Sequence, residues 1–167
     1  AVLNLAARLL PAGEAYLEVG TYKGRSLCGA VIGVSDRTFY ASENYLEFGM
    51  LGQEAQDELR RNLAEHAAGV DVRLIEGDCF VTLATPGVIQ QPVGVYFYDG
   101  KHTTLAHYLA LGLVEPLLAD EALVLVDDAT WPVVQKAHRA YLSRHPGWSV
   151  VARWDAKQTG DPLWANG

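Results

Sequence analysis

Three carboxylates and one imidazole follow two apolar runs in the chain. Asp99 and His102 follow the run Val93–Tyr98 in the order Asp-Gly-Lys-His. Asp127 and Asp128 follow the next apolar run along the chain. Near-continuous apolar runs are typical of parallel strands buried on both faces, and adjacent parallel strands end at the same edge of a sheet. The three carboxylates are therefore expected to lie together, and they would repel one another unless a cation such as Mg²⁺ lay between them.

His102 is the candidate general base of this cluster. Histidine titrates near neutral pH, so its imidazole can accept a proton from a hydroxyl group that a metal ion has made more acidic. The competing interpretation is that His102 only caps a helix beginning at Thr103. N-capping also competes with metal binding for Asp99 and Asp127.

A second candidate site is the turn after the predicted strand Ala15–Val19. Gly20 and Gly24 are spaced G-x-x-x-G, which lets the backbone approach a ligand closely, and the helix that follows offers free N–H groups to an anion. This spacing differs from the G-x-G-x-x-G of dinucleotide-binding turns. A tight strand-to-helix connection without a ligand is the alternative.

With Glu18, Gly20, Tyr22 and Ser26, this turn resembles the first motif of class I S-adenosylmethionine (SAM)-dependent methyltransferases. It is similar above all to catechol O-methyltransferase, in which an acid, a glycine, an aromatic residue and a serine recur at the same offsets. The resemblance implies that Gly20 lies against the methionyl part of SAM. It also implies that Ser26 binds the SAM carboxylate near the helix N-terminus, where the helix dipole favours negative charge.

The resemblance extends to the ends of the next two predicted strands. Glu43 follows the second strand, where the family places an acid that accepts both ribose hydroxyls. Asp78 and Cys79 follow the third strand, where Asp78 and the backbone of Cys79 would contact the adenine. The alternatives are that Glu43 is a solvent-facing loop acid and that Asp78 caps the next helical turn.

The Asp-Gly-x-His and Asp-Asp patterns resemble the macrocin branch of metal-dependent O-methyltransferases. They are also similar to SAM-binding proteins of antibiotic biosynthesis such as cephalosporin hydroxylase. The resemblance implies SAM-dependent methylation of a small hydroxylated molecule, with Mg²⁺ held by Asp99, Asp127 and Asp128 and with His102 as the base. Contact of Asp99 with the amino group of SAM, without a metal, is the competing interpretation.

Alternating strands and helices must position these residues. Apolar runs separated by Gly and Pro predict one domain over 1–167. The expected fold is an open, doubly wound, mostly parallel Rossmann-like sheet with helices on both faces. The remaining histidines, His66, His107, His138 and His145, fall on predicted helices and are interpreted as ordinary amphipathic or surface residues. The predicted strands are Ala15–Val19, 38–41, 70–75, Val93–Tyr98, 122–126 and 148–153, and the predicted helices are 3–10, 26–32, 52–68, 103–118 and 131–144.

The chain departs from the family pattern at both ends. It begins with Ala1 instead of Met, which indicates a trimmed or processed start, and few residues precede the first strand to form a lid. The family's last, antiparallel strand would begin near Trp164, so that strand is truncated or missing. The acceptor pocket is expected from 44–52, Trp131, 154–164 or another subunit of a homo-oligomer.

The composition argues against several other classes of protein. The 167 residues carry 13 Lys and Arg against 20 Asp and Glu, a net charge of −7, which argues against a nucleic-acid-binding protein. No apolar run is long enough for a membrane span, and no secretory leader opens the chain. The two cysteines, Cys28 and Cys79, have no metal-ligand spacing, and reduced thiols in a cytoplasmic protein are expected.

Two rival functions follow from the same residues. One is a SAM-binding module that does not methylate, and the other is a nicotinamide oxidoreductase. The glycine spacing and the absence of a Tyr-x-x-x-Lys pair disfavour the oxidoreductase.

Overall fold

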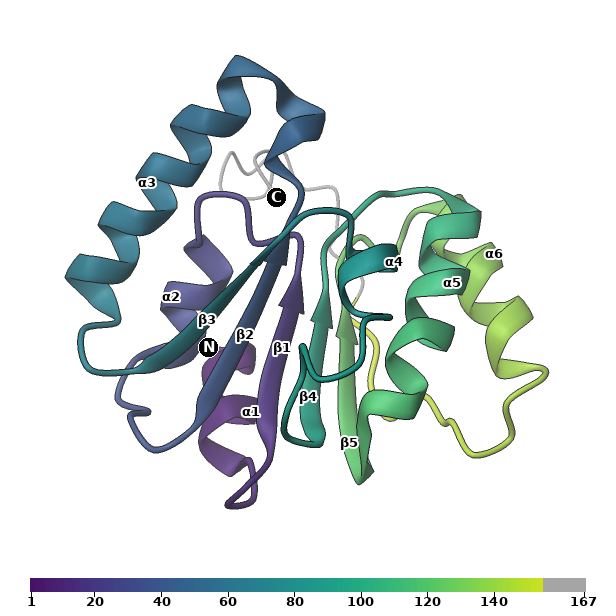
Figure 1. Cartoon of the computed structure of the whole chain (residues 1–167). Helices are drawn as coiled ribbons and strands as arrows, with labels where there is room; N and C mark the ends of the chain where they lie inside the picture. The colour runs from purple at the N-terminus through teal and green to yellow at the C-terminus, as the bar shows by residue number, and fades with distance from the viewer. Residues whose placement is uncertain (155–167) are drawn as a thin grey trace.

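A parallel five-stranded sheet forms the centre of the protein in the computed structural model, which describes residues 1–154 (Figure 1). The strand order is β3-β2-β1-β4-β5, and every neighbouring pair is parallel. The order reverses between β1 and β4, which is the point where open α/β sheets bind ligands. The strands are β1 Ala15–Val19, β2 Thr38–Glu43, β3 Asp71–Glu76, β4 Val93–Tyr98 and β5 Leu118–Val126.

Helices cover both faces of the sheet, which confirms the predicted fold class. Helices α1, α2 and α3 pack on one face, and α4 and α5 pack on the other, with α6 beside α5 (Figure 1). None of the helices in the described part is long and apolar enough to span a bilayer. The helices are α1 Val2–Leu9, α2 Arg25–Val31, α3 Met50–His66, α4 Cys79–Thr82, α5 Thr104–Val114 and α6 Pro132–Leu142, with short 3₁₀ turns η1 Tyr45–Phe48 and η2 Glu115–Leu117.

The two central strands, β1 and β4, are buried at every position. Side chains that alternate along a strand point to opposite faces, so Tyr16 packs with α2 and α3 while Leu17 packs toward α5. Both strands match the ranges that the sequence predicts. Their burial on both faces explains why they lack polar positions apart from Glu18.

The sixth strand predicted at 148–153 is wrong, because these residues have no regular structure. The indole Nε1 of Trp148 donates to Glu115 Oε1 at 3.2 Å, and its ring packs edge-on against Tyr141. These contacts hold the segment against the end of α5 and α6. The strand before it, β5, is longer than predicted and begins at Leu118. The strand expected near Trp164 lies outside the described residues.

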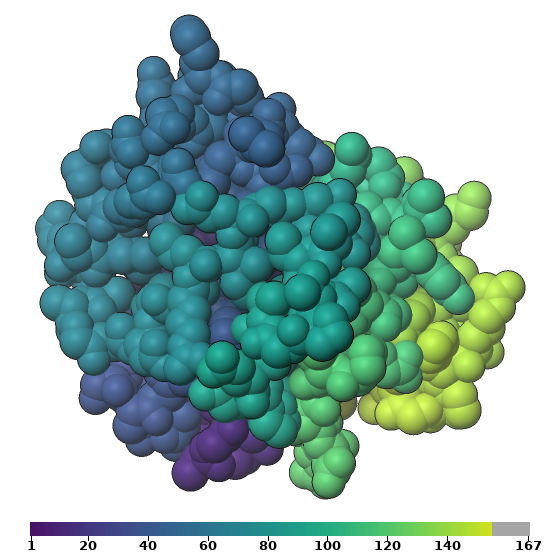
Figure 2. Space-filling model, in the orientation of Figure 1, coloured from purple at the N-terminus to yellow at the C-terminus, as the bar shows by residue number. Residues whose placement is uncertain are grey.

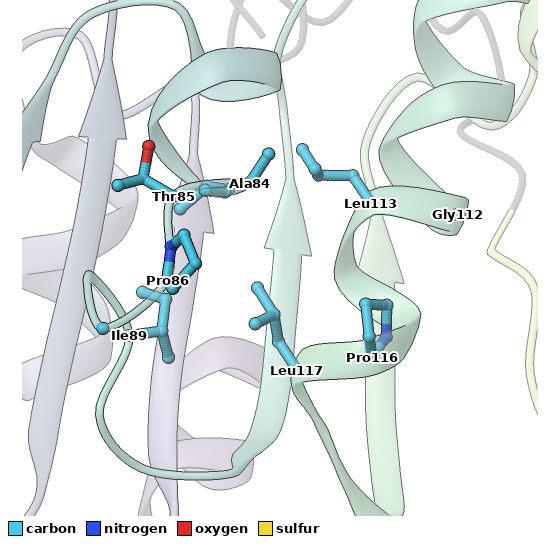
Figure 3. A pocket seen from close by; sticks show the side chains of 10 residues that line it. Ala84, Thr85, Pro86, Ile89, Gly112, Leu113, Pro116 and Leu117 are labelled. Carbon is cyan, nitrogen blue, oxygen red and sulfur yellow. The ribbon is translucent and has the colours of Figure 1, made fainter.

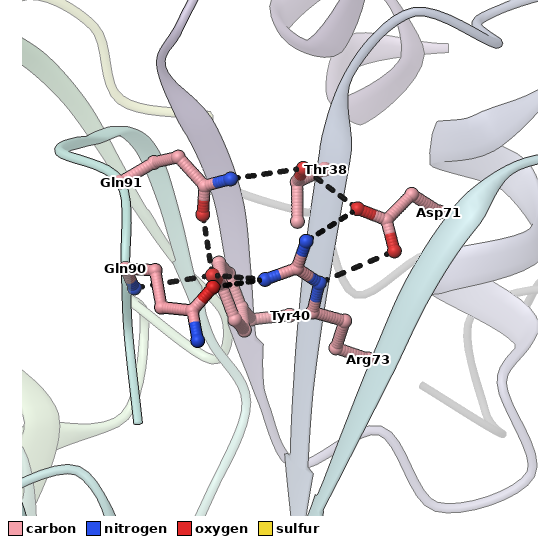
Figure 4. A network of polar contacts seen from close by, with 6 residues as sticks. All are labelled: Thr38, Tyr40, Asp71, Arg73, Gln90 and Gln91. Carbon is pink, nitrogen blue, oxygen red and sulfur yellow. Dashed lines mark hydrogen bonds and ion pairs between the residues drawn. The ribbon is translucent and has the colours of Figure 1, made fainter. Parts of the chain in front are cut away.

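A polar network ties the buried hydroxyl of Tyr40 to the loop before β4 (Figure 4). That hydroxyl accepts from Arg73 Nη1 and from the backbone N–H of Gln90, each at 3.1 Å, and donates to Gln91. Arg73 is itself held by Asp71 at 2.9 Å. The network fixes β2 and β3 against the segment that leads into β4.

Tyr40→Phe should lower the free energy of unfolding by roughly 1–3 kcal/mol, because it removes the three part-buried hydrogen bonds of the hydroxyl, each with a net contribution of roughly 0.5–1.5 kcal/mol. Urea unfolding followed by circular dichroism measures this loss. The control is Tyr22→Phe on an exposed ring, which should change stability by less than about 0.5 kcal/mol. Equal stability of Tyr40→Phe and the parent would show that the network contributes nothing.

Candidate active site at the carboxyl edge of the sheet

Backbone hydrogen bonds place the ends of the strands side by side. Each donor is the first N–H past one strand, and each acceptor is a carbonyl at the end of the neighbouring strand. The predicted site residues that follow the strands are therefore brought to one edge of the sheet. The four bonds are Gly20 N to Ser42 O at 3.0 Å, Gly77 N to Glu43 O at 2.9 Å, Asp99 N to Val19 O at 2.8 Å and Asp127 N to Tyr98 O at 3.1 Å.

Gly20 allows β1 and β4 to approach each other at this edge. Its φ is +92°, and a Cβ atom added there would lie 2.0 Å from the carbonyl oxygen of Asp99. A side chain at Gly20 would thus collide with the protein's own backbone before it met a ligand. The fold itself therefore requires a glycine at this position, whether or not a ligand binds at the turn.

Glu18 is fully buried beneath the glycine turn. Its Oε1 accepts from Ser26 Oγ at 2.7 Å and its Oε2 accepts from Tyr16 OH at 2.9 Å. Burial raises the pKa of Glu18 to about 7, and the hydrogen bonds from Ser26 and Tyr16 limit the rise. Sequence reasoning missed Tyr16, although a residue two positions before Glu18 on a strand must share its face.

Glu43 ends β2 and is held by two backbone groups. Its Oε2 accepts from Tyr22 N at 2.6 Å, and its Oε1 accepts from Asn44 N at 2.8 Å. Burial raises its pKa. Glu43 is therefore not a solvent-facing loop acid, and its two oxygens keep lone pairs for further donors. Tyr22 lies beside it with φ +46°, in the left-handed region.

Asp78 caps the short helix α4 and accepts from the backbone N–H of Phe80 at 2.9 Å. The capping alternative is thus observed. Cys79 follows it, and burial raises the pKa of this thiol to about 11. Both residues stand at the end of β3, next to Glu43 through the bond from Gly77 to the Glu43 carbonyl.

Asp99, Asp127 and Asp128 form an acidic cluster at the ends of β4 and β5. Burial first, and then repulsion from Asp127 and Asp128, raises the pKa of Asp99 to about 7. Asp127 Oδ1 accepts from Asp128 N at 2.8 Å. Burial and Asp127 also raise the pKa of Asp128. The carboxylate oxygens of this cluster are of the kind that binds hard cations. Within residues 1–154, however, no three His, Cys, Asp or Glu side chains form a group that could hold a metal ion.

The His102 ring stands between two of these carboxylates. Its Nε2 lies 3.0 Å from Asp128 Oδ2 and 3.7 Å from Asp99 Oδ1, although the contact with Asp128 lacks the alignment of a hydrogen bond. A protonated imidazole would pair with both acids. Thr103 caps α5 instead, since its hydroxyl accepts from Ala106 N at 3.1 Å, so His102 is not the cap.

A buried histidine behind His102 was not predicted. His107 is 1% exposed, and its ring centroid lies 5.6 Å from those of both His102 and His138 and 4.9 Å from that of Tyr98. Burial lowers its pKa to about 4. His107 is thus a core residue and not the amphipathic or surface residue expected from its helical position.

Two cavities lie away from this edge, and the first is mainly apolar. One has a volume of about 330 Å³ between α5 and the loop after α4, lined by Pro86, Leu113 and Leu117 among others (Figure 3). The second, of about 710 Å³, is lined by α1, Glu14 and the start of β5. Neither is lined by a residue predicted for the active site.

A family model described as a methyltransferase domain matches residues 17–129, which is more than half of the chain. This range includes every predicted site residue. The search of curated proteins gave no match.

Solved structures of methyltransferases share the fold. The O-methyltransferase TomG of Streptomyces achromogenes, involved in tomaymycin synthesis and solved with SAM, has 23% identity and a TM-score of 0.64 over 89% of this chain. An O-methyltransferase of Bacillus cereus, solved with S-adenosylhomocysteine (SAH), has 16% identity and a TM-score of 0.63 over 87%. SAH-bound PaMTH1 of Podospora anserina has 20% identity and a TM-score of 0.59 over 75%. The aligned regions cover 67%, 66% and 49% of those chains, respectively.

Acid should destabilise the protein through His107. Its pKa falls from 6.5 to about 4 on folding. As the pH falls through this window, the unfolded chain takes up a proton at His107 that the folded chain does not, so this residue alone lowers stability by about 3 kcal/mol. Glu18 and Asp99 act in the opposite direction, because their pKa values are raised in the folded protein. Between pH 7 and about pH 4, the free energy of unfolding, measured with urea, should therefore change less favourably for the parent than for His107→Phe. Parallel pH profiles would contradict this assignment.

Proposed function

The chain belongs to this family of class I SAM-dependent methyltransferases, as its first glycine turn predicted, and we propose that it methylates a hydroxyl oxygen of a small molecule. The supporting observation is the close approach of His102 to two partly buried carboxylates, Asp128 and Asp99, at the edge where the sheet order reverses. SAM, when bound, supplies a methyl group already activated by the sulfonium. The protein then has to align the acceptor oxygen and receive its proton.

The ends of β1 and β2 provide the proposed binding groups for SAM. Glu43 has free lone pairs for the ribose hydroxyls, and the turn at Gly20 is proposed to lie against the methionyl part. The Ser26 hydroxyl donates to Glu18 in this structure. With its pKa near 7, Glu18 can instead donate its own proton to Ser26, which frees the Ser26 hydroxyl for the SAM carboxylate. Tyr22 would flank the methionyl part.

Asp78 and Cys79 complete the proposed cofactor site at the adenine. One oxygen of Asp78 accepts from Phe80 N and the other is free to accept from the exocyclic amine. The backbone N–H of Cys79 stands in the first turn of α4, where helix N–H groups have no intrahelical acceptor. Capping and adenine binding are thus compatible at this strand end.

Glu43→Gln should weaken SAH binding by roughly 1.5–3 kcal/mol, because it removes the charge that strengthens both ribose hydrogen bonds. Isothermal titration calorimetry measures the affinity. The matched control is the exposed Glu47→Gln, which should bind SAH as the parent does. If a folded Glu43→Gln protein binds SAH with unchanged affinity, the ribose assignment is wrong.

Proton transfer is proposed to run from the acceptor hydroxyl to His102. The imidazolium that results would be stabilised by Asp128 and Asp99, whose oxygens lie 3.0 and 3.7 Å from Nε2. The proton therefore moves into a site that already carries negative charge.

We also propose that Asp99, Asp127 and Asp128 hold a divalent cation of the Mg²⁺ type. The chemistry of the donor set fits, because burial and then repulsion from Asp127 and Asp128 raise the pKa of Asp99, and a cation would relieve that repulsion. The three side chains do not converge on one point in this structure, so cation binding would require them to rearrange. When bound, the ion would make the acceptor hydroxyl more acidic.

The acceptor is proposed to lie between the η1 turn and Trp131. The segment of η1 and the start of α3 protrudes at the top of Figure 2, and Leu46 and Met50 there are 90% and 87% exposed. Trp131 is half-exposed, with its ring 5.2 Å from that of His102. These apolar surfaces support an acceptor with an apolar face.

His102→Ala should lower kcat by roughly 10²–10⁴, the usual contribution of general acid–base catalysis, with the SAH dissociation constant unchanged. SAM turnover against catechols and polyols, with Mg²⁺ and with EDTA, provides the assay. His66→Ala, on the exposed part of α3, is the control.

Three outcomes separate the alternatives. EDTA should abolish turnover if the cation is required, and full activity in EDTA would remove the metal from the proposal. A His102→Ala protein as fast as the parent would remove the base. SAM binding without turnover on the whole panel would favour the non-methylating module.

A further inference from the structure

Three hydrogen-bonded side chains lie beneath the glycine turn. The Tyr16 hydroxyl donates to Glu18 Oε2 at 2.9 Å, and the Ser26 hydroxyl donates to Glu18 Oε1 at 2.7 Å. Tyr16 and Glu18 are fully buried, whereas Ser26, in the first turn of α2, is partly exposed. A ligand at this turn can therefore touch Ser26 directly, while Tyr16 and Glu18 act on the ligand through Ser26.

Tyr16 leaves one oxygen of Glu18 for exchange. Its ring packs against Phe39, with the centroids 5.3 Å apart. Burial raises the pKa of Tyr16, so its hydroxyl keeps its proton and remains a donor. Because this hydroxyl is bound to Oε2, a proton that Glu18 takes up is directed to Oε1, the oxygen that faces Ser26.

The Ser26 hydroxyl has one proton to donate, and in this structure Glu18 accepts it. If Ser26 turned to a ligand carboxylate while Glu18 stayed ionised, the lone pairs of Ser26 would face a buried negative charge without a donor between them. A proton from solvent on Glu18 Oε1 removes this conflict. The protonated Glu18 then donates to Ser26 Oγ, and Ser26 donates to the ligand.

We infer that Tyr16 is a positioning residue of the cofactor site, which holds Glu18 against Ser26 so that the Ser26 hydroxyl passes to the cofactor carboxylate as Glu18 takes up one proton. The pKa of Glu18, raised by burial to about 7, places this exchange in the neutral range. The inference rests on the proposed function, because it takes the carboxylate of SAM or SAH as the ligand of Ser26.

Titratable groups of the neighbouring elements also face Glu18. Repulsion from Glu43, at the end of β2, raises the pKa of Glu18, and Glu18 in turn raises that of Asp99, after β4. Burial and Glu18 raise the pKa of the Cys28 thiol in α2, so this thiol stays protonated. Glu43 and Asp99 can themselves gain or lose a proton when the cofactor binds, so Glu18 has to be isolated by comparison of variants.

The test is the affinity for SAH, measured by isothermal titration calorimetry between about pH 6 and about pH 8.5. Relative to Glu18→Gln, which is a permanent donor, the parent should lose affinity above pH 7 by up to about tenfold per pH unit, because its binding form carries one more proton. Titrations in two buffers with different ionisation enthalpies should show that the parent takes up about one proton more than Glu18→Gln at pH 8.

Tyr16→Phe separates positioning from a purely structural role. Loss of the donor to Oε2 makes Glu18 a weaker acid, so the fall in affinity should begin about one pH unit higher than in the parent. This variant should therefore bind SAH more tightly than the parent at pH 8, whereas a structural role predicts weaker binding at every pH. The control is Tyr96→Phe, a fully buried ring on the other face of the sheet, which should keep the pH profile of the parent.

Ser26→Ala should bind SAH more weakly at low pH and should no longer respond to Glu18→Gln, because the exchange runs through its hydroxyl. If Ser26→Ala keeps the pH profile of the parent, Glu18 acts by charge alone and the inference is overturned. Identical profiles of the parent, Tyr16→Phe and Glu18→Gln would also overturn it. That result is expected if the Thr21 hydroxyl, buried without a partner, replaces Ser26 as the donor to Glu18.

Thermal unfolding establishes that each variant is folded, and Glu18→Gln and Ser26→Ala decide the matter if Tyr16→Phe does not fold. Failure of the inference and failure of the proposed function give different results. SAH binding without a pH dependence that involves Glu18 would reject the inference and leave the cofactor site in place. Absence of SAH binding to the folded parent would reject both.

Discussion

The hydrogen bond from Asp99 N to the carbonyl oxygen of Val19, 2.8 Å long, joins the two central strands at their ends. It requires the backbone of β1 to turn away within one residue, and only Gly20, at φ +92°, leaves room for the Asp99 carbonyl. The equivalent bond from Asp127 N to Tyr98 continues the row to β5. Every acidic group of the candidate site takes its place from this row of strand ends.

The same alignment concentrates negative charge in a poorly solvated place. Glu18 and Asp99 each have a pKa near 7, and burial is the first cause for both. The pKa values of Glu43 and Asp128 are raised as well. Such a site stores unfavourable electrostatic energy, which a positively charged ligand would relieve. The sulfonium and ammonium groups of SAM, and a divalent cation, are ligands of that kind.

Sequence reasoning located the buried centre of the fold well and its periphery poorly. Ala15–Val19 and Val93–Tyr98 were predicted residue for residue, because strands buried on both faces are apolar throughout. Residues 148–153 also contain apolar side chains, but they have no regular structure, and Trp148 contacts Glu115 and Tyr141 outside the sheet. His107 was missed because helical spacing alone does not tell which side of α5 meets α6. The packing around Gly20 likewise depends on a strand distant in sequence.

The most direct measurement of the central claim is a crystal structure of the chain with SAH bound. The account predicts the nucleoside across the ends of β1, β2 and β3, with the ribose hydroxyls donating to Glu43 and the sulfur facing His102. Binding of SAH in either of the two cavities away from this edge, or at this edge without contact to Glu43, would contradict it.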